Sequence, residues 1–181
     1  MHYCGIIKGK PLYKGGDMPE QEITVKVRVL KINPKKAIIK RGAKAKTCKE
    51  YLEENGSEIW NKLRGIKNAL FEPIGILLTK ELLKPGTSEY VQGVVMHGNY
   101  DGKIPEGFEI IDIPSFELML FQGPVFDEDR AEEAIAEIRH IIEEYDPRPE
   151  GFAWAPEEGP IFQPEPRGYR GYIEARPVKR L

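Results

Sequence analysis

The feature that most constrains the fold of this chain is an internal repeat. Shifting the sequence by 81 residues places Arg41-Gly42 over Gln122-Gly123, and it places the apolar run from Val29 over the one from Ile110. With one further residue of shift, Tyr90-Val91-Gln92 lies over Tyr172-Ile173-Glu174. Because apolar positions fall on apolar positions and turns on turns, the pattern indicates a duplicated structural unit. Chance alignment of two similar halves is the alternative, since the identities are few.

Each copy is predicted to contain a strand, a helix and two further strands. In the first copy, alternating apolar and polar residues over 23–30 predict a half-buried strand. The capping-box spacing of Thr47 and Glu50 then predicts the start of a helix, which Asn55-Gly56 interrupts or bends. In the second copy, apolar residues at three- and four-residue steps over 131–145 predict the matching helix.

One such unit leaves a sheet face and a helix stripe without cover. Two copies should therefore pair about a pseudo-two-fold axis, with a groove where they meet. We predict an α+β fold made of tandem strand-helix-strand-strand units, with an antiparallel sheet and two main helices on one side of it. Repeat one should span about 23–100 and repeat two about 104–181, in a single domain of residues 23–181. Residues 1–22 are expected to form an N-terminal tail or a short hairpin.

Composition limits the classes of function. The sequence has no unbroken apolar run of about 18 residues, as a membrane span requires, and no signal peptide is expected, so the default location is the cytoplasm. A net charge of −2 argues against nucleic acid as a general partner. Basic residues nevertheless gather at 23–49 and acidic ones at 127–146. These segments are two solvated faces of opposite sign, or the basic one is a patch for an anionic partner.

The sequence contains no standard catalytic or metal-binding motif. Cys4 and Cys48 form no close-spaced pair, so we expect structural or incidental thiols and neither a metal nor a cofactor. His2, His97 and His140 have no ligand spacing. No serine lies in a nucleophile elbow, and Lys14-Gly15-Gly16 is too short to bind a phosphate.

An acidic residue lies within the strongly β-prone segment near the C-terminus. Successive side chains of a strand alternate between its faces, so Tyr172, Glu174 and Arg176 should share one face of the segment 171–178. Glu174 could therefore point to solvent, pair with Arg176, or be a buried acid that serves a site. Burial would raise its pKa unless a cation or a hydrogen bond compensates.

Three segments of the sequence resemble the GyrI-like small-molecule-binding domain, the effector-binding part of multidrug-responsive MerR- and AraC-type transcription regulators. They are the stretch from Ile104-Pro105-Glu106 to Pro114, Phe121-Gln122-Gly123-Pro124, and Gly171-Tyr172-Ile173-Glu174-Ala175-Arg176-Pro177-Val178. The similarity covers about 23–181. It implies the same tandem repeat, and a pocket between the repeats that is lined by aromatic residues, has an acid at its base, and accepts lipophilic and often cationic compounds.

Transferred to this sequence, the resemblance implies that Glu174 is the pocket acid and that Tyr172 and Tyr90 lie on equivalent strands. Trp60 would turn inward from the first-repeat helix, and Trp154 and Phe152 could close the pocket from above. Core packing is the alternative for the tyrosines and for Trp60. The short stretch before residue 23 cannot hold the helix-turn-helix of such regulators, so direct DNA binding is not expected.

Three functions remain open from the sequence. The first is a stand-alone protein that senses or sequesters lipophilic compounds, including cationic ones. The second is a hydrolase of reactive small electrophiles, as some stand-alone members of the family are, with Glu174 as general base and Tyr90 or Tyr172 as hydrogen-bond donor. The third is a protein-protein module that inhibits a gyrase-like enzyme. Enzymatic activity is therefore an open question, and a protein partner is a third kind of ligand to consider.

Overall fold

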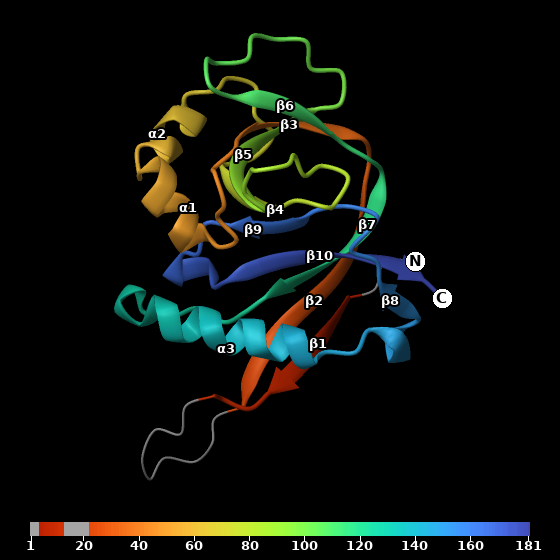
Figure 1. Cartoon of the computed structure of the whole chain (residues 1–181). Coiled ribbons are helices and arrows are strands. Elements are labelled where there is room, and N and C mark those ends of the chain that lie inside the picture. The colour runs from red at the N-terminus through yellow and green to blue at the C-terminus, as the bar shows by residue number, and fades with distance from the viewer. Residues whose placement is uncertain (1–3, 13–21) are drawn as a thin grey trace.

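The computed structural model describes residues 4–12 and 22–181 and has an α+β architecture (Figure 1). Its strands are β1 (Cys4–Gly9), β2 (Ile23–Ile32), β3 (Lys35–Lys40), β4 (Ile74–Leu77), β5 (Tyr90–His97), β6 (Glu109–Ile113), β7 (Phe116–Gln122), β8 (Phe152–Trp154), β9 (Ile161–Pro164) and β10 (Ile173–Arg180). Its α-helices are α1 (Cys48–Asn55), α2 (Ile59–Arg64) and α3 (Ala131–Glu144). These elements confirm a helix followed by further strands in each repeat. Each repeat has two strands before its helix and not the single one predicted, β2 and β3 in the first repeat and β6 and β7 in the second.

The strands form one strongly curved antiparallel sheet, in the order β1-β2-β7-β10-β9-β4-β5-β3-β6. The short strand β8 pairs with the C-terminal end of β10, outside this order. Helices α1, α2 and α3 lie on the same side of the molecule, on the left in Figure 1. The predicted fold class, with its antiparallel sheet and its helices on one side, is therefore confirmed.

The register of the strands shows the pseudo-two-fold relation. In the first repeat Lys40 pairs with Gln92, and in the second Phe121 pairs with Glu174. These two pairs are equivalent under the shifts found in the sequence, 81 residues for the first strand and 82 for the last. The halves meet where β4 pairs with β9, at Gly75 and Gln163. The pseudo-axis passes through this last pair.

Each repeat also gives its leading strand to the other half of the sheet. Strand β2, from the first repeat, pairs with β7 of the second, and β6, which precedes β7, pairs with β3 of the first. The two pairings are equivalent under the 81-residue shift. Lys31 lies opposite Glu117, and the shifted counterparts of these two residues, Asp112 and Lys36, lie opposite each other. The two halves are thus interlocked at both ends as well as joined at the centre.

Local sequence sets the ends of the first-repeat helices. The Thr47 hydroxyl accepts a hydrogen bond from the backbone N–H of Glu50 at 3.3 Å, which caps α1. Gly56 ends this helix with a φ of 76°, a conformation that glycine adopts without steric cost. Helix α2 then begins at Ile59 and continues the apolar stripe. The predicted helix start at Thr47 and the predicted interruption are confirmed, although the Glu50 carboxylate accepts from the backbone N–H of Lys46 and not from that of Thr47 as a full capping box would require.

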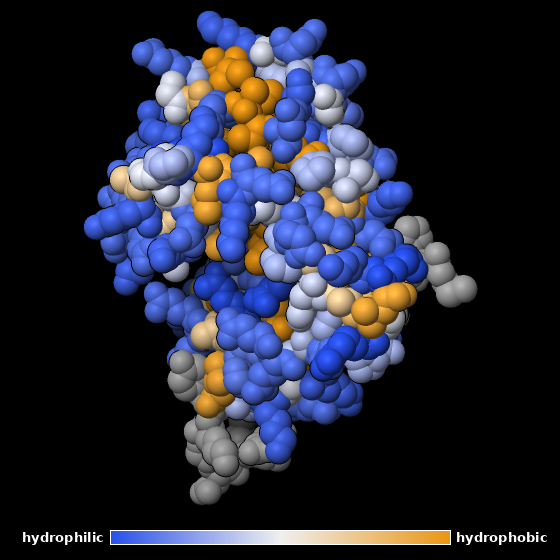
Figure 2. Space-filling view, turned by 45° about the vertical axis from the view of Figure 1, so that its right-hand side comes forward, coloured by the Kyte–Doolittle hydropathy of each residue, from blue (hydrophilic) through white to orange (hydrophobic). Residues whose placement is uncertain are grey.

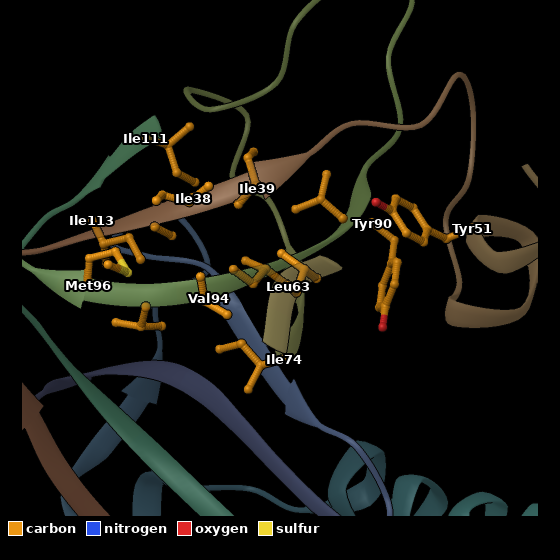
Figure 3. Close-up of a cluster of buried hydrophobic side chains, with 14 of the residues drawn as sticks. Ile38, Ile39, Tyr51, Leu63, Ile74, Tyr90, Val94, Met96, Ile111 and Ile113 are labelled. Atoms are coloured by element: carbon orange, nitrogen blue, oxygen red, sulfur yellow. The ribbon is translucent and has the colours of Figure 1, made fainter. Parts of the chain in front are cut away.

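Two clusters of apolar side chains hold the layers together. The larger joins β3, β4, β5 and β6 to α1 and α2, and Figure 3 shows Tyr51 and Tyr90 together at one end of it. Their rings make an edge contact at 5.7 Å. The smaller cluster joins β2, β7 and β10 to Ile138 and Ile142 of α3. The outer face in Figure 2 is mostly hydrophilic, with apolar residues in a few patches.

The N-terminal prediction is only partly covered by the structure. Residues 1–3 and 13–21 of the predicted tail or hairpin lie outside the described residues. Within the described part, β1 pairs with β2, with Cys4 opposite Arg28. No helix in residues 4–12 and 22–181 is long and apolar enough to cross a membrane.

Candidate functional site

A cavity of about 830 Å³ lies where the two repeats meet. One wall comes from α1 and α2, with Leu52 and Trp60, and the opposite wall comes from α3, with Ile135 and Arg139. Its other lining residues include Tyr90 at the start of β5, Gln163 of β9, and Tyr172, which directly precedes β10. The groove expected between the copies is therefore present, and both repeats contribute to it.

The helical periodicity of α3 divides its residues between the core and the cavity. Ile138 and Ile142 pack on the sheet, Arg139 lines the cavity, and Ile135 does both. Residues one position apart on an α-helix point about 100° apart, so one helix can serve both surfaces. Helix α3 is thus a wall of the site as well as a cover of the second-repeat strands.

Glu174 is buried beneath this cavity, with 1% of its surface exposed. Its Oε2 accepts hydrogen bonds from the Tyr172 hydroxyl at 2.6 Å and from Gln163 Nε2 at 2.9 Å. Its Oε1 accepts one from Arg176 Nε at 2.6 Å. The solvent-exposed alternative is therefore wrong. The acid is buried, and it also makes the pair with Arg176 that the shared strand face suggested.

Arg139 brings a second cation close to Glu174. Its Nε donates to the Tyr172 hydroxyl at 2.9 Å and lies 3.9 Å from Glu174 Oε2. Its guanidinium carbon lies over the Tyr172 ring, 5.3 Å from the centroid, within the range of a cation–π interaction. Burial and the neighbouring Glu174 raise the pKa of the Tyr172 hydroxyl. Burial alone would lower the pKa of Arg139, but Tyr172 and Glu174 outweigh it and raise that pKa.

This geometry bears on the catalytic hypothesis. A general base must reach the proton that it removes, directly or through one water. Both carboxylate oxygens of Glu174 already accept hydrogen bonds from protein groups, and Tyr172, one of the two proposed donors, already donates to Glu174. The arrangement is better suited to holding a fixed pattern of charge at the base of the cavity than to activating water.

The first repeat has a neutral counterpart of this cluster. Tyr90 is equivalent to Tyr172 and Gln92 to Glu174, as the sequence shifts implied. Burial, together with the neighbouring Cys48, raises the pKa of the Tyr90 hydroxyl. Gln92 is fully buried, its Nε2 contacts Cys48 Sγ at 3.7 Å, and its Oε1 has no hydrogen-bond partner among the described residues. The duplicated site therefore carries an acid in one half and an amide in the other.

The predicted aromatic residues divide into two groups. Trp60, Tyr90 and Tyr172 line the cavity. Trp154 and Phe152 do not, because the pairing of β8 with the far end of β10 places them in the smaller apolar cluster. The Trp154 ring lies 6.0 Å from that of Phe121, and Phe152 is 3% exposed. The lid expected from these two residues is not formed.

Sequence reasoning missed Arg139, Gln163 and Cys48 as members of the site. Arg139 lies off the apolar stripe of its helix and looked like an ordinary surface charge. Gln163 lies on the short strand β9, whose place beside β4 depends on the meeting of the repeats. Gln92 could have been found, because the internal alignment already set it over Glu174.

The chain matches solved structures at the level of the fold. SAV2435, in a structure bound to tetraphenylphosphonium, matches with a TM-score of 0.53 and 14% identity, over 84% of this chain and 93% of that one. This chain has the SAV2435 fold. The likeness agrees with the resemblance to the GyrI-like domain noted in the sequence.

Two further structures also align with this chain. EcmrR in a complex with DNA matches with a TM-score of 0.48 and 12% identity, over 87% of this chain and 58% of that one. The EcmrR C-terminal domain matches with a TM-score of 0.43 and 11% identity, over 87% and 99%. No protein-family model and no curated protein matches the sequence. The assignment therefore rests on the SAV2435 fold and concerns the fold alone.

Proposed function

We propose that this chain binds lipophilic small molecules in the cavity between its repeats, and thereby senses or sequesters them. The observation that carries the proposal is the cavity itself. Its volume of about 830 Å³ falls in the range of small-molecule sites, roughly 300–1,000 Å³. Leu52, Trp60 and Ile135 give it apolar walls, and the polar groups gather at the base with Glu174.

Two further facts support this function. The tyrosine and tryptophan side chains of the lining offer flat faces to an aromatic ligand and attract cations. SAV2435, which shares this fold, has a structure with tetraphenylphosphonium, a lipophilic cation, bound to it. The geometry of Glu174 does not favour hydrolysis, because both of its carboxylate oxygens already accept hydrogen bonds from protein donors.

Fluorescence of Trp60 provides a direct test. The chain has two tryptophans, so Trp154→Phe leaves Trp60, in the cavity wall, as the single reporter. We expect tetraphenylphosphonium or tetraphenylborate, added to the purified Trp154→Phe protein, to change Trp60 emission saturably at a 1:1 ratio. Calorimetry on the unmodified chain should give the same stoichiometry.

A cavity-filling variant locates the binding. Ala136 lines the cavity, so Ala136→Phe should weaken binding by more than about tenfold by occupying its volume. Ala134, on another face of the same helix, lines a separate hollow beside Pro124, and Ala134→Phe is the matched control that should keep binding. Equal affinities for the Ala136→Phe and Ala134→Phe proteins, or no saturable binding of either probe, would contradict the proposed function.

A further inference from the structure

Arg139 already occupies the position that a bound cation would need. A lipophilic cation in this cavity would gain most from the face of a tyrosine ring near a carboxylate. The guanidinium of Arg139 lies on the Tyr172 ring at 5.3 Å, and its Nε lies 3.9 Å from Glu174 Oε2. An incoming cation would have to displace this side chain or accept a like charge beside it.

The charge of Glu174 is also balanced without Arg139. Arg176 is the nearer cation, with its Nε 2.6 Å from Oε1, and its side chain is only 22% exposed. Glu174 and Arg176 therefore form a neutral pair, and Arg139 leaves one positive charge in excess at the base of the cavity. A charge that is partly withdrawn from water acts more strongly on a ligand than an exposed one.

The remaining charged residues of the lining are weaker influences. Lys49, Glu53 and Glu132 are exposed, so water and salt screen them. Glu165 is paired with Arg167 at 2.7 Å and with Arg64 at 3.2 Å. The Arg139 side chain is 39% exposed, but it alone among the charged lining residues is held against the buried Tyr172 and Glu174, by the Nε hydrogen bond and the ring contact.

We propose that Arg139 sets the charge selectivity of the cavity, so that lipophilic anions are preferred to cations of the same shape. Within the described part of the chain, the hydrogen bonds of Arg139 involve Nε alone, which leaves Nη1 and Nη2 for an anionic group such as a carboxylate. The Tyr172 hydroxyl holds the guanidinium in place for this contact. This inference rests on the proposed function and assigns the ligand class of the same site.

The test compares tetraphenylborate with tetraphenylphosphonium, which have nearly the same size and shape and opposite charge. The measured quantity is the ratio of their dissociation constants, obtained by calorimetry. We expect Arg139→Gln to shift this ratio by roughly tenfold toward the cation, as one partly screened charge a few ångströms from the ligand implies. Lys62→Gln, which removes an exposed charge from α2, is the control and should leave the ratio unchanged.

Salt gives a second measurement that needs no substitution. If Arg139 governs selectivity, raising the ionic strength should weaken tetraphenylborate binding to the unmodified protein and strengthen tetraphenylphosphonium binding. A ratio that Arg139→Gln leaves unchanged, or salt effects of the same sign for both probes, would overturn the inference while the proposed function stands. Failure of both probes to bind would overturn the proposed function as well.

Discussion

At the scale of single residues, the most consequential feature is the environment of Glu174. Three donors, Tyr172, Gln163 and Arg176, satisfy a carboxylate that is almost completely removed from water. A buried charge is tolerated only when its partners are in place, and removing one member of such a pair is costly. The equivalent Gln92 avoids this requirement because it carries no charge.

Glu174→Gln should therefore destabilise the protein. The substitution keeps the size of the side chain, but it leaves the Arg176 charge without its partner and turns an amide N–H₂ toward a donor. We expect the free energy of unfolding to fall by about 3 kcal/mol, measured by urea denaturation. Glu157→Gln, which breaks an exposed pair with Lys179, is the control. If the two variants lost the same stability, Glu174 would not have the role described.

At the scale of secondary-structure elements, the junction of β4 and β9 controls the floor of the cavity. Gly75 lies at the pseudo-axis, and a Cβ atom built there would approach the Tyr90 hydroxyl oxygen to 2.0 Å. Real atoms do not come that close, so the glycine is what allows Tyr90 to lie across β4. The position of one cavity tyrosine thus depends on the absence of a side chain on the neighbouring strand.

Gly75→Ala should displace Tyr90 and cost about 1–3 kcal/mol through overpacking. It should also weaken binding of the probe compounds, because Tyr90 lines the cavity. Gly65→Ala is the matched control, since Gly65 ends α2 with an ordinary helical backbone and an added Cβ meets nothing closer than 3.3 Å. The measurements are thermal unfolding and probe titration of both variants. A Gly75→Ala protein with unchanged stability and probe affinity would contradict the dependence of Tyr90 on Gly75.

At the scale of the whole molecule, three buried tyrosines link stability to alkaline pH. Burial raises the pKa of Tyr51, Tyr90 and Tyr172 above the ordinary value of about 10. A group whose folded-state pKa is raised stabilises the fold fully below its unfolded-state pKa, and this stabilisation is lost as the pH rises further. The protein should therefore keep its stability up to about pH 10 and lose it steeply above.

The urea midpoint, followed from about pH 8 to pH 11.5, checks this expectation. Tyr172→Phe should make the alkaline loss shallower, since one of the ionising groups is removed. Tyr169→Phe should not change the slope, because Tyr169 is 72% exposed. A midpoint that stays level through pH 11.5 in the unmodified protein would show that the buried hydroxyls do not control alkaline stability.

Much of this architecture could be predicted because it depends on local sequence patterns. The alternation in β2, the cap at Thr47 and the stripe of α3 depend on near neighbours in the sequence, and the repeat shift identified equivalent strands. Contacts between distant elements could not be predicted in this way. The pairing of β8 with β10 placed Trp154 against the smaller apolar cluster, and the packing of α3 beside the start of β10 brought Arg139 to Tyr172.

The exchange of β2 and β6 between the halves has a consequence for how such a chain can arise. Neither half forms its part of the sheet alone, because each half includes a strand from the other, β2 beside β7 and β6 beside β3. A polypeptide made of one half alone should therefore form a homodimer with the same architecture. A tandem fusion of two copies would keep this architecture within one chain. The two equivalent positions could then differ, as they do here with Gln92 and Glu174.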